Sequence, residues 1–323
     1  MTKDFRIIFI GTPEFAVASL KALVDSNFQV VTVVTSPDRP SGRGQKIQES
    51  DVKQFAKKCN IPILQPEKLK NDDFINQLRS LNADLQIVVA FRMLPEVIWS
   101  MPRLGTINLH ASLLPQYRGA APINHVIMNG EKKSGVTTFF IEKDIDTGKI
   151  IYSEEVEIKF TDSAGILHDK LMETGAGLLV KTVKAIQSDN YPQVDQHTAL
   201  ALGEALHQAP KIFKDTCQIQ WDKDIYKVYN FIRGLSPYPT AWTILQQLEN
   251  SESITAKIFE TAIEIGNHGL IPGSIISDEK STMKVAVAGG FLQIKSIQAE
   301  GKRRLDIEEF LRGFKNILSY RFV

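Results

Sequence analysis

Cysteine is scarce in this chain of 323 residues, which contains only Cys59 and Cys217. Two cysteines far apart in the sequence have neither the spacing of a metal-ligand cluster nor the number that a disulfide framework needs. The six histidines do not form a ligand cluster either. This composition is typical of a protein in a reducing compartment, so we expect a cytoplasmic protein without a bound metal.

Long apolar runs are also missing from the chain. No segment approaches the ~18 consecutive apolar residues of a membrane-spanning helix. Residues 1–6 lack both the apolar run of a signal peptide and the Arg/Ser bias of a transit peptide. We therefore expect no membrane partner and no export.

A large excess of charge of either sign is absent. The chain has 38 Lys and Arg against 37 Asp and Glu, which gives a net charge of +1. A polyanionic partner such as a nucleic acid would have to bind a local basic patch. The apolar fraction of 43% and the charged fraction of 23% are those of a soluble globular protein. The length favours two domains.

In the first half of the chain, short apolar runs alternate with segments whose apolar residues recur at helical spacing. This pattern predicts strands at 5–10, 30–35, 85–90, 105–109, 136–141 and 150–158, and helices at 14–26, 51–59, 72–81 and 163–187. The alternation favours an α/β domain with a Rossmann-like, mostly parallel sheet covered by helices on both faces. Between these elements, the Pro- and Gly-rich segment 36–44 is expected to form neither helix nor strand.

The pattern changes after the polar segment 188–210, which contains two prolines. A strand at 218–221 and a helix at 225–232 are expected there. Short apolar runs separated by turn residues then follow at 256–259, 273–276, 284–287 and 291–297. Such runs are typical of a small antiparallel β-barrel, here OB-like. We assign residues 1–189 to the α/β domain, 190–207 to a linker and 208–323 to the barrel domain.

The densest group of reactive side chains follows the predicted strand at 105–109. Asn108 and His110 are two residues apart, so both project to the same side of an extended chain. An amide donor then lies beside an imidazole that can carry a proton near neutral pH. Asp146 follows another strand and could reach the same face of the sheet, beyond whose carboxyl ends ligands bind. Taken singly, a buried histidine, an asparagine cap and an Asp-Thr-Gly turn each have an ordinary structural explanation.

These residues occur together with further motifs. The combination of Asn108-Leu109-His110, Ser112-Leu113-Leu114-Pro115, Arg118-Gly119 and Asp146-Thr147-Gly148 resembles the folate-dependent formyltransferase family. Residues 11–16, 36–44 and 272–273 with 301–303 are similar to the members of this family that act on methionyl-tRNA. The resemblance extends from about residue 5 to about residue 315.

The resemblance implies transfer of a formyl group from 10-formyltetrahydrofolate to the amino group of initiator methionyl-tRNA, without a metal. It makes Asn108, His110 and Asp146 the catalytic set. Asn108 Nδ2 and His110 would donate to the formyl oxygen, while Asp146 orients His110 and helps to move protons. It also makes residues 1–189 the catalytic domain and 208–323 a tRNA-binding domain of an expected monomer.

The family's binding sites carry over in the same way. The folate site is expected at Phe91, Arg92, Met93, Leu94, Ser112, Leu113, Leu114, Pro115, Ile141 and Asp144, although many members have Gly at the position of Arg92. The tRNA contacts are expected at Arg39, Arg43 and Lys46, within the loop 36–50.

Three alternatives stay open at this point. A formyltransferase for nucleotides or amino sugars would share the catalytic set but should lack the sequence of residues 39–44. A nicotinamide dehydrogenase would need G-x-G-x-x-G where this chain has Gly11-Thr12-Pro13, and Pro13 removes a backbone donor. A non-catalytic tRNA-binding module would leave the three polar residues unexplained. The basic loop and the run 302–304 also fit an ordinary solvated surface.

Overall fold

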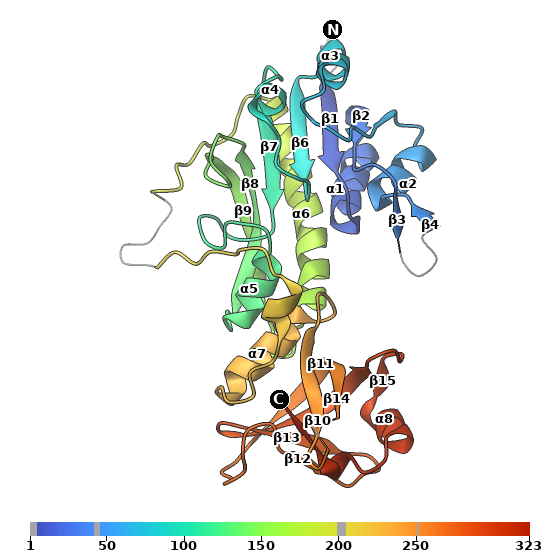
Figure 1. The fold of residues 1–323 in the computed structure, drawn as a ribbon. Coiled ribbons are helices and arrows are strands. Elements are labelled where there is room, and N and C mark those ends of the chain that lie inside the picture. The colour runs from blue at the N-terminus through green and yellow to red at the C-terminus, as the bar shows by residue number, and fades with distance from the viewer. Residues whose placement is uncertain (1–4, 42–45, 199–204, 251) are drawn as a thin grey trace. The chain divides into compact units, whose positions relative to one another are not determined.

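The computed structural model describes residues 5–41, 46–198, 205–250 and 252–323, and these form two compact units (Figure 1). The first unit contains Met1–Gly119, Lys133–Glu157 and His168–Gln208. The second contains Ala120–Lys132, Ile158–Leu167 and Ala209–Val323. The second unit therefore takes two short segments from the first half of the sequence. The functional domain boundaries at 189 and 208 stay a prediction.

A seven-stranded sheet with the order β5-β2-β1-β6-β7-β8-β9 forms the centre of the first unit. The strands are β1 (Arg6–Gly11), β2 (Gln29–Val34), β5 (Ile63–Leu64), β6 (Leu85–Val89), β7 (Thr106–His110), β8 (Lys133–Phe140) and β9 (Ile150–Glu157). The first five are parallel to their neighbours, whereas β8 and β9 run antiparallel. The predicted Rossmann-like, mostly parallel sheet is confirmed.

Helices cover both faces of this sheet. They are α1 (Glu14–Asp25), α2 (Asp51–Lys58), α3 (Asp72–Ser80), α4 (Glu96–Trp99) and α6 (Ala164–Gln187). On one face, apolar side chains of β1, β2 and β6 pack with those of α3 and α4, in a cluster that includes Ile10, Val88, Phe74 and Ile98. On the other face, Gly175 of α6 leaves just enough room for Leu109 of β7 to lie against the helix.

The second unit contains α5 (Pro122–Met128), α7 (Ile225–Leu235), α8 (Ile307–Gly313) and an antiparallel sheet. Its strand order is β12-β13-β14-β11-β10-β16, with β15 (Leu305–Asp306) paired to β14. The strands are β10 (Ala241–Gln247), β11 (Ser253–Ile265), β12 (Ile275–Ser277), β13 (Met283–Val287), β14 (Gly290–Ala299) and β16 (Tyr320–Phe322). A bridge between Ser274 and Arg321 joins the two edges, so the predicted small barrel is nearly closed.

Two secondary-structure predictions are wrong. Residues 218–221 form no strand: Gln218 makes a single isolated bridge with Trp242, and the apolar residues of the segment are buried in the barrel core. In the loop expected to lack strands, β3 (Arg39–Ser41) pairs antiparallel with β4 (Lys46–Gln48). Pro40 is tolerated because a two-stranded ribbon leaves one edge of each strand without a hydrogen-bonded neighbour.

In the part of the chain that the structure describes, no helix is long and apolar enough to cross a bilayer.

Candidate active site

Asn108 and His110 lie on the same face at the carboxyl end of β7. The register pairs Asn108 with Val88 of β6 and with Phe139 of β8, so both polar side chains lie on the face covered by α3 and α4. His110 is buried, with 7% of its surface exposed, whereas Asn108 is half-buried. The Asn108 amide makes no hydrogen bond to any described residue, so it is available to a ligand.

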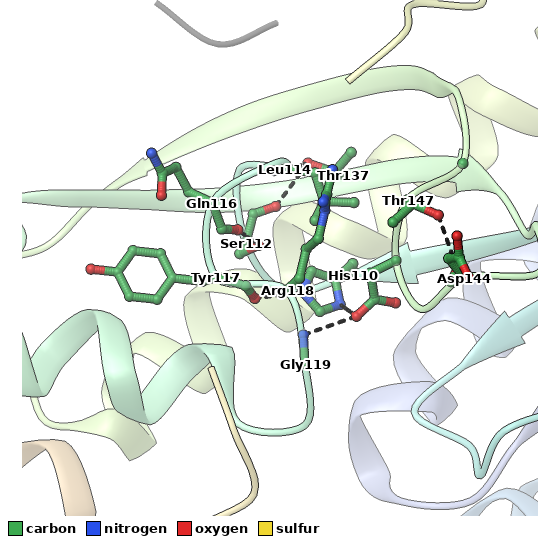
Figure 2. Close-up of polar contacts among 12 residues, drawn as sticks. His110, Ser112, Leu114, Gln116, Tyr117, Arg118, Gly119, Thr137, Asp144 and Thr147 are labelled. Carbon is green, nitrogen blue, oxygen red and sulfur yellow. Dashed lines mark hydrogen bonds and ion pairs between the residues drawn. The ribbon is translucent and has the colours of Figure 1, made fainter. Parts of the chain in front are cut away.

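The loop after β7 folds back onto the strand that carries His110. Thr137 of β8 organises it, because its Oγ1 donates to Ser112 O (2.7 Å) and accepts from Leu114 N (3.2 Å). Ser112 Oγ donates to Gln116 O, which tightens the turn (2.6 Å; Figure 2). Tyr117 follows with a left-handed φ of 59°, and its carbonyl oxygen reaches His110 Nε2 at 3.0 Å.

This contact decides which nitrogen of His110 carries a proton. A carbonyl oxygen can only accept, so Nε2 must be the protonated nitrogen in the hydrogen bond to Tyr117 O. Nδ1 then has no proton in the neutral ring. It lies 3.8 Å from Asp146 Oδ2, a distance that is too long for a hydrogen bond but within the range of an ion pair. His110 can therefore gain a proton only at Nδ1, on the side of Asp146.

Asp146 lies in a tight turn between β8 and β9. Its φ of 53° is left-handed, and Oδ2 accepts a hydrogen bond from Gly119 N at 3.0 Å. Thr147 Oγ1 donates to Asp144 O across the turn. A Cβ on Gly148 would lie 1.7 Å from Phe140 O, so only glycine fits where the turn returns to the sheet. The turn thereby directs the carboxylate at His110.

Gln196, which no sequence motif singles out, also contacts this turn. Its side chain is 2% exposed, and Nε2 donates to Asp146 O (2.9 Å) and Gly148 O (2.8 Å). Its Oε1 accepts from Arg118 Nε (3.0 Å) and Nη2 (2.6 Å). Nothing local in the sequence distinguishes one glutamine within a polar segment that was expected to be a linker.

The residues expected to bind folate fall into three groups. Leu94, with the half-buried Phe91 and Ile141, packs on the apolar cluster under the end of β6, while Met93 is 72% exposed. Ser112, Leu113, Leu114 and Pro115 belong to the loop after β7, where the Ser112 hydroxyl is already engaged and the Leu114–Pro115 peptide is cis. Asp144 is exposed, and its carbonyl closes the Asp146 turn.

Arg92 does not point to an obvious ligand position. Its guanidinium donates to Pro66 O (2.6 Å) and Glu67 O (3.0 Å), which ties the segment after β6 to the segment before α3.

The residues expected to bind tRNA lie on or beside the β3–β4 hairpin. Arg39 is exposed on β3, Lys46 belongs to β4, and Arg43 lies outside the described residues.

The two acids that flank this hairpin are both engaged by lysines of α2. Asp38 pairs with Lys53, whose hydrogen bond lowers the pKa of this carboxyl below its usual value. Glu49 pairs with Lys57 and Lys53, and the hydrogen bond from Lys57 lowers its pKa most. Because both acids are already paired, they do not neutralise the basic residues of the hairpin.

In the part of the chain that the structure covers, no group of three or more His, Cys, Asp and Glu side chains could hold a metal ion.

The chain matches two family models along most of its length. Residues 5–183 match the family described as Formyl transferase, and residues 211–315 match Formyl transferase, C-terminal domain. It is 53% identical over 313 residues to the methionyl-tRNA formyltransferase of Bacteroides thetaiotaomicron, with 97% of each chain covered. It is 48% identical over 311 residues to that of Flavobacterium johnsoniae, with 96% of each covered.

Solved structures share the fold at low sequence identity. A sugar 3N-formyl transferase crystallised with dTDP and 5-N-formyl-THF superposes with a TM-score of 0.62 at 20% identity, covering 93% of this chain and all of that one. HypX from Aquifex aeolicus in complex with tetrahydrofolic acid gives a TM-score of 0.63 at 16% identity, covering 96% of this chain and 47% of that one. The two family matches and the full-length relatives together establish that this chain belongs to the formyl transferase family.

Proposed function

We propose that the chain transfers the formyl group of 10-formyltetrahydrofolate to the amino group of initiator methionyl-tRNA, giving formylmethionyl-tRNA, with Asn108, His110 and Asp146 as its catalytic residues. One observation carries the proposal: at the carboxyl end of β7, a His–Asp pair lies beside an amide that has no partner among the described residues. It occurs in a chain that is 53% identical over nearly its whole length to a protein named for this reaction.

The segment after β6 fits a flat, polar-edged heterocycle such as a pterin. Phe91, Leu94 and Ile141 supply an apolar wall, and Met93 supplies an exposed apolar side chain. The backbone groups of Arg92 and Met93 make no backbone hydrogen bond to any described residue. Unpaired backbone donors and acceptors next to apolar side chains are what a ligand of this kind requires.

The reaction forms a bond between the formyl carbon and the amine and breaks the bond from that carbon to N10. Negative charge develops on the formyl oxygen as the amine attacks. Asn108 Nδ2, which has no partner in the part of the chain that the structure describes, donates to this oxygen and stabilises the charge. A free α-amino group has a pKa near ~8 and arrives largely protonated. One proton is therefore lost to solvent before the attack, and the amine gives up a second as the amide forms.

His110 and Asp146 supply the proton path. Nε2 is occupied by Tyr117 O, so the proton from the amine is taken at Nδ1. The Asp146 carboxylate at 3.8 Å stabilises the resulting imidazolium, which then gives this second proton from Nδ1 to the leaving N10. Once protonated, Nδ1 can also donate to the formyl oxygen before its proton moves to N10, because it is the ring nitrogen that the backbone does not hold.

We also propose that residues 1–189 act as the catalytic domain and that Arg39, Arg43, Lys46 and the domain 208–323 contact the tRNA.

Replacing Arg43 by Ala should weaken tRNA use without changing folate use. If Arg43 meets a phosphate, the salt slope of tRNA binding should fall by about one. Unchanged tRNA affinity and unchanged discrimination against elongator tRNA would contradict this assignment. We expect the active species to be a cytoplasmic monomer.

The test is an assay with 10-formyltetrahydrofolate and charged initiator tRNA, run beside a dTDP-linked amino sugar as the rival acceptor. His110→Ala and Asp146→Ala should each lower turnover at least ~100-fold, the usual scale for lost acid–base catalysis. The exposed pair His168 and Asp169, whose Nδ1 to Oδ1 distance is 3.0 Å, offers matched controls. Preference for the sugar, or near-normal turnover of the His110 variant, would overturn the proposal.

A further inference from the structure

The turn that carries the Asp146 carboxylate is held by a side chain 50 residues further along the sequence. Gln196 Nε2 donates to the carbonyl oxygens of Asp146 and Gly148, which bracket the turn. The Gln196 segment is itself attached to the sheet, because Val194 and Ile150 exchange two backbone hydrogen bonds of 2.8 and 2.9 Å. The position of Gln196 is therefore set by β9 and not by the turn that it holds.

The partners of Gln196 determine which way its amide points. The two carbonyl oxygens can only accept hydrogen bonds, and the guanidinium of Arg118 can only donate them. Nε2 must face Asp146 and Gly148, and Oε1 must face Arg118, as observed. Both donors and both acceptor positions of the amide are used, and the side chain is 2% exposed. A rotated amide would break all four hydrogen bonds.

These contacts close a ring around the catalytic pair. Gln196 binds the main chain of Asp146, and Arg118 binds Gln196. Arg118 is followed directly by Gly119, whose N–H donates to Asp146 Oδ2. Arg118 is preceded by Tyr117, whose carbonyl holds His110 Nε2. The loop that orients His110 and the turn that presents Asp146 are thus joined directly by Gly119 N and also through the buried amide of Gln196.

We propose that Gln196 and Arg118 form a positioning pair that sets the separation of His110 and Asp146, an inference that rests on the proposed function. Neither residue touches a reacting atom. Asp146 has a left-handed φ of 53°, a conformation that persists only when the surroundings enforce it. Without Gln196, both carbonyls of the turn lose their donor, the turn relaxes, and the carboxylate moves away from Nδ1. A displacement near 1 Å at such a site can cost about 100-fold in rate.

The substitutions follow from the hydrogen-bond inventory. Gln196→Leu removes all four hydrogen bonds at similar volume. Gln196→Glu keeps the contact with Arg118 but replaces the donor by a carboxylate oxygen, which repels the two carbonyls. Arg118→Lys keeps the charge but cannot form the paired bonds from Nε and Nη2. Each variant should lower kcat by about 10- to 100-fold and leave the KM for folate and for tRNA within about threefold.

Gln86 provides the matched control. It is also a buried glutamine, 1% exposed on β6. Its Oε1 accepts from Thr106 Oγ1, and among the described residues its Nε2 has no hydrogen-bond partner and no hydrogen bond links it to the Asp146 turn. Gln86→Leu therefore perturbs the interior of the same sheet without touching the ring, and should leave kcat within about twofold of wild type.

The decisive experiment measures kcat, both KM values and the melting temperature for wild type, Gln196→Leu, Arg118→Leu, the double variant and Gln86→Leu. If the two residues act as one unit, the double variant loses no more kcat than the more impaired single variant. The positioning proposal is overturned if the wild type is active and the kcat of Gln196→Leu lies within twofold of the wild-type kcat. A loss confined to melting temperature and shared by Gln86→Leu also overturns it, since it indicates a purely structural role. An inactive wild type instead overturns the proposed function.

Discussion

Gly148→Ala is the most severe small change that the structure predicts near the site. A Cβ built on Gly148 lies 1.7 Å from Phe140 O and 2.9 Å from Phe140 C, whereas real Cβ atoms essentially never approach within 3.0 Å. Because the contacted atoms are backbone of β8, no side-chain rotation relieves the overlap. The turn must move away from the strand by roughly 1.3 Å to raise the distance from Cβ to Phe140 O from 1.7 Å to the 3.0 Å limit.

That movement carries Asp146 with it, because Asp146 and Gly148 are two residues apart in one turn and share the donor Gln196 Nε2. A misplacement of about 1 Å can lower a rate about 100-fold, so we expect a fall of that order in the kcat of formyl transfer. The KM for folate should change less, because the apolar wall at Phe91, Leu94 and Ile141 is not displaced. Steady-state kinetics with 10-formyltetrahydrofolate and charged initiator tRNA measure both quantities.

Gly177→Ala is the matched control. Gly177 lies in α6 with no heavy atom within 4 Å of its added Cβ. Alanine there should raise stability by up to about 1 kcal/mol, since glycine is the poorer helix former, and leave kcat unchanged. A Gly148→Ala variant with wild-type kcat and wild-type melting temperature would refute the steric argument. A lowered melting temperature with unchanged kcat would refute the coupling of this turn to catalysis.

Three further predictions concern other parts of the molecule. Lys53 lowers the pKa of Asp38 and helps to lower the pKa of Glu49. The stabilisation that Lys53 gives to the base of the hairpin is therefore fully present above the ordinary carboxyl pKa values of 3.8 and 4.5. It is lost as the pH falls through the lowered pKa values of the two acids. Melting curves should therefore show the wild type's advantage over Lys53→Met at neutral pH and little advantage in strong acid, and a difference independent of pH would contradict this. Arg233 is buried, which lowers its pKa, and it donates to Asp162 O (2.7 Å) and Asn230 Oδ1 (2.8 Å). Arg233→Met should lower the free energy of unfolding in urea by about 1–3 kcal/mol. An unchanged unfolding midpoint would refute this. A chain ending at Gln208 lacks α7, and α5 is bound to α7 through the hydrogen bond from Asn124 Nδ2 to Gly234 O (2.7 Å). This truncated chain should fail to give a monodisperse folded species in gel filtration and circular dichroism. A stable fragment that binds folate would contradict this.

The local part of the site could be predicted from the sequence. Asn108 and His110 share a face because side chains alternate along any strand, and the apolar run before them made a strand the natural interpretation. The same logic predicted most elements of the parallel sheet and the short strands of the barrel. It failed at residues 39–41, where proline and glycine argued against a strand, because pairing with residues 46–48 outweighed local propensity.

The resemblance to the family motifs predicted a role for Asp146, but only the tertiary structure shows how this residue reaches His110. That approach requires β8 to return antiparallel beside β7 and a left-handed turn that Gly148 alone can follow. The protonated nitrogen of His110 is likewise decided by Tyr117 O, a backbone atom in a loop whose path the sequence does not reveal.

Residues 194–196 and α5 also have contacts that the sequence does not predict. By composition, residues 194–196 read as linker and α5 reads as part of the α/β half. In the structure, Gln196 holds the Asp146 turn, and α5 belongs to the second compact unit. Strand alternation and helical spacing are set by neighbouring residues, so the sequence alone determined them. The contacts of Gln196 with Asp146 and of α5 with α7 join residues 50 and 110 positions apart, and such contacts depend on the folded path of the whole chain.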